Sequence, residues 1–438
     1  MTQPMQSIPF APADPRAALS QLPASPAVFA LYGAEAHLEP YIGHTPNLRS
    51  RLERLLQPSP IHPRRLQLAG RVRRIDYQLT GSEFESLLTQ FSLLEDVYGA
   101  KALERMHLRA PAFVRFLGSN AYPRVTVTHR PSQREADWAY GPFPSRAAAE
   151  RYVDEALKLF LLRRCTDDLH PDPSHPGCVY SEMKMCLAPC YKGCTDARYV
   201  EEAAAVEAFL ATRGESRLVQ LRSQRDEASA NLEFEAAAAL HAQVQRVEGV
   251  RALAPELVRP LSQLRAVILQ ASANPDEVAV FLFEHGRLRG PIGFSTVGMR
   301  IQNEQSGSSS LFAHPVAVQP IPEAPGPEAA PHAAPEAPAK LARGILESRM
   351  ETVLAALSES HEAPSATLRQ GHLALLKRWY YRPEARRPGE IFFPDAENHW
   401  PVKALLRGIG RVAAKALGVA AEKQSTAVTL SGQGNAPA

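Results

Sequence analysis

Five cysteines gathered into one short stretch constrain this chain more than any other feature of its sequence. They are Cys165, Cys178, Cys186, Cys190 and Cys194, in the spacing C-x12-C-x7-C-x3-C-x3-C. In a reducing compartment, closely spaced thiols are better explained by metal or cluster ligation than by disulfides, because soft thiolates select zinc or iron-sulfur centres. Nearby His170 and His175 could instead complete a zinc site. The stretch therefore predicts a metal centre, with the identity of its metal left open.

The N-terminus indicates the compartment. Its opening residues, MTQPMQSIPFAPADPR, have neither the basic start nor the apolar core of a secretory signal. No apolar run approaches the roughly 18 residues that a membrane span needs. We therefore expect a cytoplasmic protein with no membrane partner.

Arginine is concentrated between Tyr41 and Thr80, although the net charge of the whole chain is only +3. Planar guanidinium groups bind phosphate oxygens in pairs, so this segment suits a polyanion such as DNA. A solvated helix face is the alternative. The candidate DNA-binding residues are Arg49, Arg54, Arg64, Arg65, Arg71, Arg73 and Arg74, with Arg51 in the same segment.

Changes in hydrophobic pattern along the chain predict an α+β multidomain fold. Residues 196–251 are helical in character, and we expect an αα-hairpin with its turn near Asn231 and Leu232. The predicted divisions are a loose tail (1–21), a small α/β domain (22–127), a cysteine-rich helical region with the metal centre (128–200), a helical region with the hairpin (201–255), a β-rich region (256–310), a Pro/Ala-rich linker (311–340), a helical part of a C-terminal α/β region (341–420) and a disordered tail (421–438).

The surroundings of the cysteines resemble the central region of the UvrC family. The segment GPFPS at 141–145, the run LFLLRRC and the tetrapeptide LAPC at 187–190 carry the resemblance. It implies a [4Fe-4S] cluster held by Cys165, Cys178, Cys186 and Cys190, with Zn2+ as the alternative, and it leaves Cys194 as an extra cysteine.

The segment PAVFALYGAEAHLEPYIGHTPNLRSRLERLL resembles the GIY-YIG nuclease core of the same family. The resemblance implies that Tyr41 activates water, that Arg51 stabilises the phosphate and that a carboxylate holds Mg2+ or Mn2+. His44 takes a position that is usually lysine, Phe29 replaces the first signature tyrosine, and Gln90 replaces the metal-binding glutamate. An amide is a poor Mg2+ ligand. We therefore expect a degenerate site and leave enzymatic activity open, with Glu83 or Glu85 as substitute ligands if the helix register differs.

Residues 222–250 resemble the UVR motif through which UvrC contacts UvrB. The motif implies a two-helix hairpin that leaves apolar surface for a matching hairpin on the partner. The candidate partner-binding residues are Leu232, Phe234, Ala237 and Ala238.

Residues 278–294 and 375–394 resemble the part of UvrC that precedes its RNase H-like nuclease. After Pro394 only Asp395 and His399 could serve such a nuclease, so we expect a C-terminally truncated UvrC. The family implies an excinuclease ABC component of nucleotide excision repair that binds damaged double-stranded DNA and UvrB and carries out metal-dependent incision. Two alternatives stay open: a catalytically inactive accessory subunit and a redox-responsive iron-sulfur DNA binder.

Overall fold

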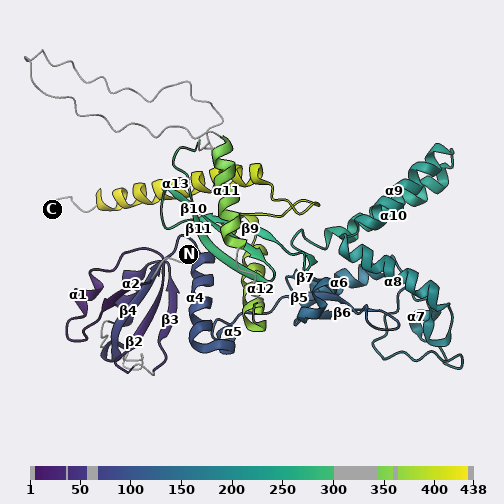
Figure 1. Cartoon of the computed structure of the whole chain (residues 1–438), viewed down its shortest axis with the longest axis horizontal. Helices are drawn as coiled ribbons and strands as arrows, with labels where there is room; N and C mark the ends of the chain where they lie inside the picture. The colour runs from purple at the N-terminus through teal and green to yellow at the C-terminus, as the bar shows by residue number, and fades with distance from the viewer. Residues whose placement is uncertain (1–4, 36–37, 57–67, 300–342, 359–363, 433–438) are drawn as a thin grey trace, which may run out of the picture.

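The computed structural model describes residues 5–35, 38–56, 68–299, 343–358 and 364–432. Within these ranges the strands form three four-stranded sheets, and every strand pairing is antiparallel. Helices separate the sheets, and one long helical hairpin projects away from the rest (Figure 1). The expected α+β multidomain architecture is therefore present.

The first sheet has the order β1-β4-β2-β3. Its buried face packs on the helix α2, which contributes Leu48, Leu52 and Leu56. The elements are β1 (Gln6–Pro9), α1 (Pro15–Leu19), β2 (Ala27–Gly33), β3 (Tyr41–Thr45), α2 (Leu48–Leu56), α3 (Leu68–Arg71) and β4 (Val72–Leu79).

The prediction of a loose tail over residues 1–21 is wrong for its described part. Strand β1 pairs with β4, so that Ile8 lies opposite Ile75. Leu19 on α1 is buried in the core of the first sheet. The proline-rich composition conceals this order because an edge strand tolerates proline where no partner needs its N-H.

Helix α4 (Glu83–Tyr98) lies between the first and third sheets. The Ser82 side chain caps it by accepting from the Glu85 N-H, as an N-terminal serine does. Its Phe84 ring packs edge-on against Phe281 of the third sheet, with 5.2 Å between ring centroids. One helix thus contributes to the packing of two sheets.

The second sheet has the order β6-β5-β7-β8. Its strands are β5 (Ala112–Phe116), β6 (Val125–Thr128), β7 (Ala139–Phe143) and β8 (Arg259–Pro260), and η1 (Gly99–Lys101), α5 (Ala102–Arg105) and η2 (Gln133–Trp138) lie before or between them. The predicted boundary after residue 127 falls inside β6, because β5 and β6 pair with each other and β5 pairs with β7. Strand pairing, which a local pattern does not reveal, determines where this unit begins.

The segment between β7 and β8 contains the cysteines and the hairpin. It comprises α6 (Arg146–Leu157), α7 (Val179–Glu182), η3 (Pro189–Tyr191), α8 (Asp196–Ala211), α9 (Glu215–Ala230) and α10 (Phe234–Ala252). Helices α9 and α10 form the predicted hairpin, with Asn231 at the C-terminal end of α9 and Leu232 in the turn at a φ of 63°. The base of the hairpin is anchored because Val244, Val247 and Val250 are buried in the core of the second sheet.

The third sheet has the order β11-β10-β9-β12 and is covered on both faces. Helices α11 and α13 pack on one face, and α4 and α12 pack on the other. The elements are β9 (Ala266–Ala271), β10 (Glu277–Glu284), β11 (Arg287–Ser295), α11 (Arg343–Ser358), α12 (Ala366–Tyr380), η4 (Glu384–Arg386), β12 (Glu390–Phe392) and α13 (Val402–Gly432).

The structure tests only one of the two unstructured segments that were predicted near the C-terminus. The Pro/Ala-rich linker at 311–340 lies outside the described residues. The disordered tail was predicted from residue 421, whereas helix α13 continues to Gly432.

Candidate functional site

Strand β3 carries two of the predicted catalytic residues at an edge of the first sheet. Tyr41 is 39% exposed, and its ring lies 6.1 Å from the ring of Phe29 between centroids. Phe29 is buried and covers Gly43, where an added Cβ would lie 3.1 Å from its ring. The phenylalanine that replaces the first signature tyrosine therefore belongs to the core of the first sheet.

His44 and Gln90 form a direct hydrogen bond between β3 and α4. The His44 Nδ1 lies 2.6 Å from the Gln90 Oε1. An amide oxygen can only accept, so the imidazole donates. The position expected to hold a divalent metal thus carries a neutral amide whose oxygen already has a partner.

Arg51 and Glu83 are two further groups that the sequence predicted for this site. Arg51 is partly buried on α2, and in the described part of the chain no hydrogen bond or ion pair joins its side chain to Tyr41, His44 or Gln90. Glu83 forms a two-point contact with Arg382, at 2.9 and 2.6 Å. The hydrogen bonds from Arg382 lower the pKa of Glu83, and burial only partly opposes them.

Glu85 is not available as a metal ligand in this arrangement. It is buried on α4, and its Oε2 accepts from the Gly81 N-H at 2.8 Å. Burial raises the pKa of Glu85 to about 7, with the Gly81 hydrogen bond acting in the opposite direction. A carboxyl with this pKa binds a proton in competition with a cation.

The five predicted DNA-binding arginines that lie within the described residues divide into three groups. Arg49 donates to the Leu22 and Ser20 carbonyls, and Arg73 donates to the Gly70 and Val72 carbonyls, so these side chains partly fix the backbone. Arg74 lies 3.0 Å from Asp76 and 4.1 Å from the Tyr32 ring centre. Arg54 and Arg71 are exposed on α2 and α3, whereas Arg64 and Arg65 lie outside the described residues.

The four predicted cysteine ligands line one small cavity in the second unit. Cys165, Cys178, Cys186 and Cys190 all contribute to its wall. Burial and the proximity of the other three thiols raise the pKa of Cys186 to about 11. In the portion of the chain that is described, no group of three or more His, Cys, Asp and Glu residues is arranged to hold a single metal ion.

Two N-H donors face the thiols. The Ala188 N-H donates to the Cys186 Sγ at 3.3 Å, and the Arg163 guanidinium donates to the Cys165 Sγ at 3.5 Å. Such donors favour the thiolate form that ligates metals. Cys194 does not line the cavity, and neither do His170 and His175, which are exposed.

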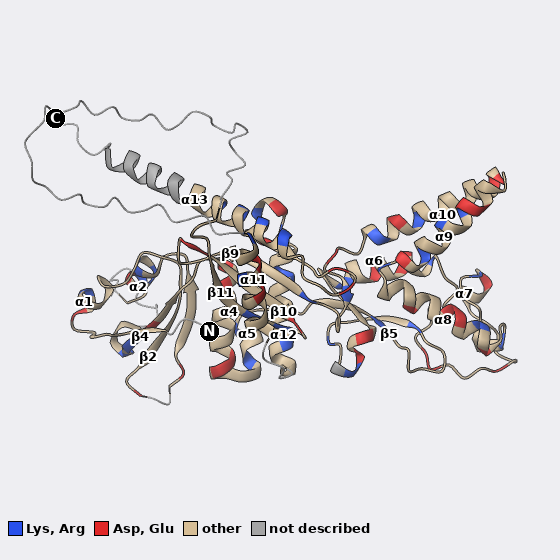
Figure 2. Ribbon diagram, turned by 45° about the horizontal axis from the view of Figure 1, so that its top comes forward, with Lys and Arg blue, Asp and Glu red and all other residues tan. Residues whose placement is uncertain are grey.

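The turn of the helical hairpin presents apolar side chains to solvent. Leu232 is 71% exposed and Phe234 is 66% exposed. Ala237 is partly buried and Ala238 is exposed, one turn further along α10. Acidic and basic residues are spread along both helices (Figure 2), and Leu232 and Phe234 are more exposed than Val219 of α9, which is 59% exposed. Among the described residues, no helix has the length and apolar character to cross a membrane.

The fold and these features define a multidomain chain with a cysteine-rich middle domain followed by a helical interaction hairpin. Residues 113–209 match the family described as UvrC/Cho excinuclease, middle domain. Residues 215–250 match the UvrB/uvrC motif. These matches confirm the UvrC resemblance that the cysteine spacing predicted, and the chain is UvrC-like in this region.

Curated relatives extend the similarity beyond the middle domain. The UvrABC system protein C of Alcanivorax borkumensis is 29% identical over 238 residues, which cover 54% of this chain and 39% of the relative. That of Pseudomonas fluorescens is 28% identical over 240 residues, or 55% and 39%. That of Aliivibrio salmonicida is 26% identical over 305 residues, or 68% and 49%. The matched part thus spans less than half the length of these relatives, and no solved structure matches the chain.

Proposed function

We propose that this chain is a UvrC-type component of the excinuclease system in nucleotide excision repair, which docks on UvrB and binds damaged double-stranded DNA. The observation that carries the proposal is the exposed turn of the α9–α10 hairpin, in the segment that matches the UvrB/uvrC motif. Exposed leucine and phenylalanine side chains on a rigid projecting hairpin suit a helical partner of the same kind. A cytoplasmic location belongs to the same proposal.

The N-terminal domain contributes DNA binding to this function through the exposed Arg54 and Arg71. In this proposal it is a GIY-YIG-like domain that does not cleave. The Gln90 amide offers a divalent cation no charge, and its oxygen accepts from His44. Phe29 also lacks the hydroxyl that a tyrosine at the first signature position would supply. The chain is then an accessory subunit that brings UvrB and DNA together.

Metal-dependent incision is the second candidate function. The exposure of Tyr41 on β3 favours it, because a tyrosine that activates water must reach substrate. In that case Tyr41 orients water, Arg51 stabilises the phosphate, and Mg2+ or Mn2+ supplies Lewis acidity when bound.

In this proposal Cys165, Cys178, Cys186 and Cys190 hold a [4Fe-4S] cluster, with a four-cysteine zinc centre as the alternative. Their cavity supplies four sulfur donors and two N-H donors, and the histidines that a mixed zinc site would use lie outside it. When bound, the cluster cross-links four positions of the chain. The protein's contribution is to hold these sulfurs and keep water from them.

The test combines binding and nicking. Anaerobically purified protein is added to UvrB on a lesion-containing duplex with Mg2+ or Mn2+, beside an Arg51→Ala variant. The accessory role predicts UvrB-dependent binding of both proteins with no nicking. Nicking by the wild type that is lost in Arg51→Ala would support incision, and absence of UvrB binding would refute the proposal.

A further inference from the structure

A large cleft of about 1180 Å³ lies where three segments distant in sequence meet. One wall is formed by residues 100–113, which run from η1 through α5 into β5. The second wall is the loop 129–132 that follows β6, and the third is the first two turns of α12. The cleft therefore joins the middle unit to the helices that cover the third sheet.

The charged side chains of this cleft are predominantly basic. Arg109, Arg130 and Arg369 line it against a single acid, Glu104. Arg109 and Arg130 are exposed, and within the described residues neither guanidinium group has an acid or carbonyl partner. His107 and His129 also line the cleft, and the His129 Nδ1 donates to the Pro111 carbonyl at 3.0 Å. An excess of cations with few counter-ions attracts an anion.

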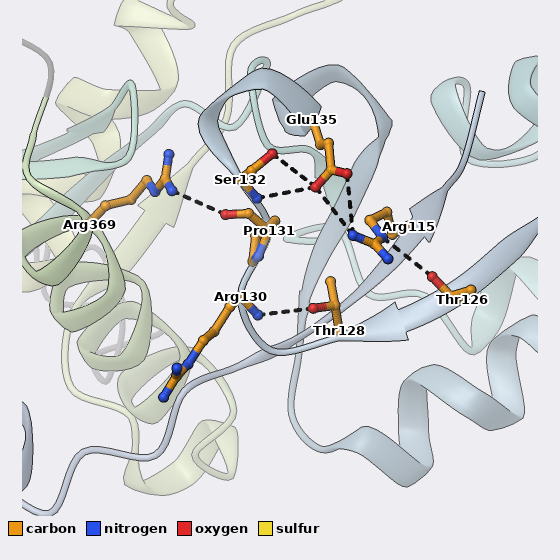
Figure 3. Close-up of polar contacts among 8 residues, drawn as sticks. All are labelled: Arg115, Thr126, Thr128, Arg130, Pro131, Ser132, Glu135 and Arg369. Atoms are coloured by element: carbon orange, nitrogen blue, oxygen red, sulfur yellow. Dashed lines mark hydrogen bonds and ion pairs between the residues drawn. The ribbon is translucent and has the colours of Figure 1, made fainter. Parts of the chain in front are cut away.

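The loop that carries Arg130 is held in place by a polar network (Figure 3). Its Ser132 side chain donates to Glu135 at 2.9 Å, and Glu135 accepts from Arg115 at 3.2 Å. Burial raises the pKa of Glu135, but the hydrogen bonds from Ser132 and the charge of Arg115 together bring it below its ordinary value. The carboxylate is thus charged and fixes the loop.

The other walls approach this loop directly. The Arg369 Nη2 donates to the Pro131 carbonyl at 3.1 Å, which joins α12 to the loop (Figure 3). The Lys377 Nζ donates to the Arg109 carbonyl at 3.3 Å, which joins α12 to the first wall. The cations therefore surround the cleft on a scaffold that is already assembled, so little ordering is needed when an anion binds.

We propose that this cleft binds phosphodiester groups of the DNA backbone, as a second contact beyond the arginines of the N-terminal domain. The space exceeds what one phosphate group fills, and its arginines come from three separate segments, as an extended polyanion requires. Guanidinium groups hold phosphate oxygens in pairs without regard to base sequence. The inference rests on the DNA binding proposed above and assigns part of it to a defined place.

The test measures how affinity for a duplex depends on salt, in wild type and in the variants Arg109→Ala, Arg130→Ala and their combination. Each lost phosphate contact should reduce the slope of log K against log salt by about 0.9. At 0.1 M salt the double variant should bind roughly 10- to 60-fold more weakly than wild type. The matched control removes the exposed Arg151 and Arg246, which lie on α6 and α10 and not in the cleft.

The outcomes separate this inference from the proposed function. A reduced slope in the cleft variants and an unchanged slope in the control, with unaltered thermal unfolding, is the expected result. An equal slope in wild type and double variant, or an equal loss in the control, would overturn the cleft while DNA binding stands. If wild type itself fails to bind the duplex, both the inference and the DNA-binding part of the proposed function fall.

Discussion

His44 and Gln90 form one hydrogen-bonded unit across the boundary between β3 and α4, with 2.6 Å between the histidine Nδ1 and the amide Oε1. Tyr41 lies three residues earlier on β3, so its side chain leaves the opposite face of the strand, where its ring lies beside Phe29. Through the hydrogen bond to His44, Gln90 gives α4 a polar contact with the sheet, and its neutral amide offers a cation no negative charge.

Restoring the carboxylate should restore metal affinity. In Gln90→Glu, charged oxygens replace the amide, and Mn2+ should bind measurably more tightly than to wild type. Titration calorimetry with Mn2+ checks this, with Gln90→Ala as the control that breaks the hydrogen bond without adding charge. Identical Mn2+ binding by all three proteins would show that the cation binds elsewhere.

A charged side chain introduced at the hairpin turn should weaken partner binding without unfolding the chain. Leu232→Asp or Phe234→Asp adds a charge that an apolar interface would have to desolvate, so affinity for UvrB should fall by about 30-fold or more. Both side chains are largely exposed, so the thermal unfolding midpoint should stay unchanged. Val219→Asp is the control, since Val219 is 59% exposed on α9 but lies outside the turn. Equal loss in Val219→Asp would mean that charge alone weakens binding.

The cavity cysteines should be distinguishable from the fifth cysteine by metal content. Replacing Cys165, Cys178, Cys186 or Cys190 by serine should remove iron and acid-labile sulfide from anaerobically purified protein, because each supplies one ligand. Cys194→Ser should retain both, since Cys194 does not line the cavity. Stoichiometric zinc in place of iron would identify the alternative centre, and loss of iron in Cys194→Ser would refute the ligand assignment.

Glu85 should make stability depend on pH near neutrality. Burial raises the pKa of Glu85 to about 7 in the folded chain. In an unfolded chain the pKa of a glutamate is about 4.3. Between these values the folded state keeps a proton that the unfolded state has released, so the free energy of unfolding falls as pH rises. Glu85→Gln should remove this slope and raise the free energy of unfolding at pH 8 by about 1–3 kcal/mol.

Denaturant titrations at pH 5 and pH 8 measure this difference. Glu83→Gln is the matched control in the same helical turn. This variant should lower the free energy of unfolding, whereas Glu85→Gln should raise it. Arg382 lowers the pKa of Glu83, so that carboxylate stabilises the fold above its ordinary pKa and loses the contribution as pH falls. A stability profile of Glu85→Gln parallel to wild type would contradict the prediction.

Gly371 should be intolerant of any side chain. An added Cβ on this residue of α12 would collide with the ring of Phe91 on α4. Gly371→Ala should therefore lower the free energy of unfolding by about 1–3 kcal/mol through overpacking. Gly410→Ala, in the interior of α13, meets nothing within 4 Å and should stabilise by about 0.5–1 kcal/mol, as alanine does in a helix interior. Calorimetric unfolding that shifts both variants in the same direction would contradict the assigned contact.

Local pattern was sufficient for much of the fold. The helices over residues 196–251 and the turn at Asn231 and Leu232 follow from periodicity and turn chemistry. The family matches over 113–250 confirm the resemblance that the cysteine spacing and the hairpin sequence carried. These features are local, so a single sequence contains them.

Non-local features were beyond this kind of inference. The order in residues 6–19 comes from pairing with β4, and the start of the second sheet comes from the pairing of β5 with β7. The sequence does not predict the basic cleft, because Arg130 and Arg369 are far apart in sequence and neither lies in an arginine-rich segment. Which side chains meet across such distances is decided by tertiary packing.

Helix α4 limits which parts of the N-terminal unit the protein can lose and still fold. Its Phe84 and Phe91 pack among Phe281, Trp379 and Leu376, although the helix follows directly from the first sheet. A deletion that removed the N-terminal unit up to residue 100 would strip the apolar face of the third sheet. A chain that keeps this face of the third sheet buried must therefore keep helix α4, whatever chemistry the first sheet performs.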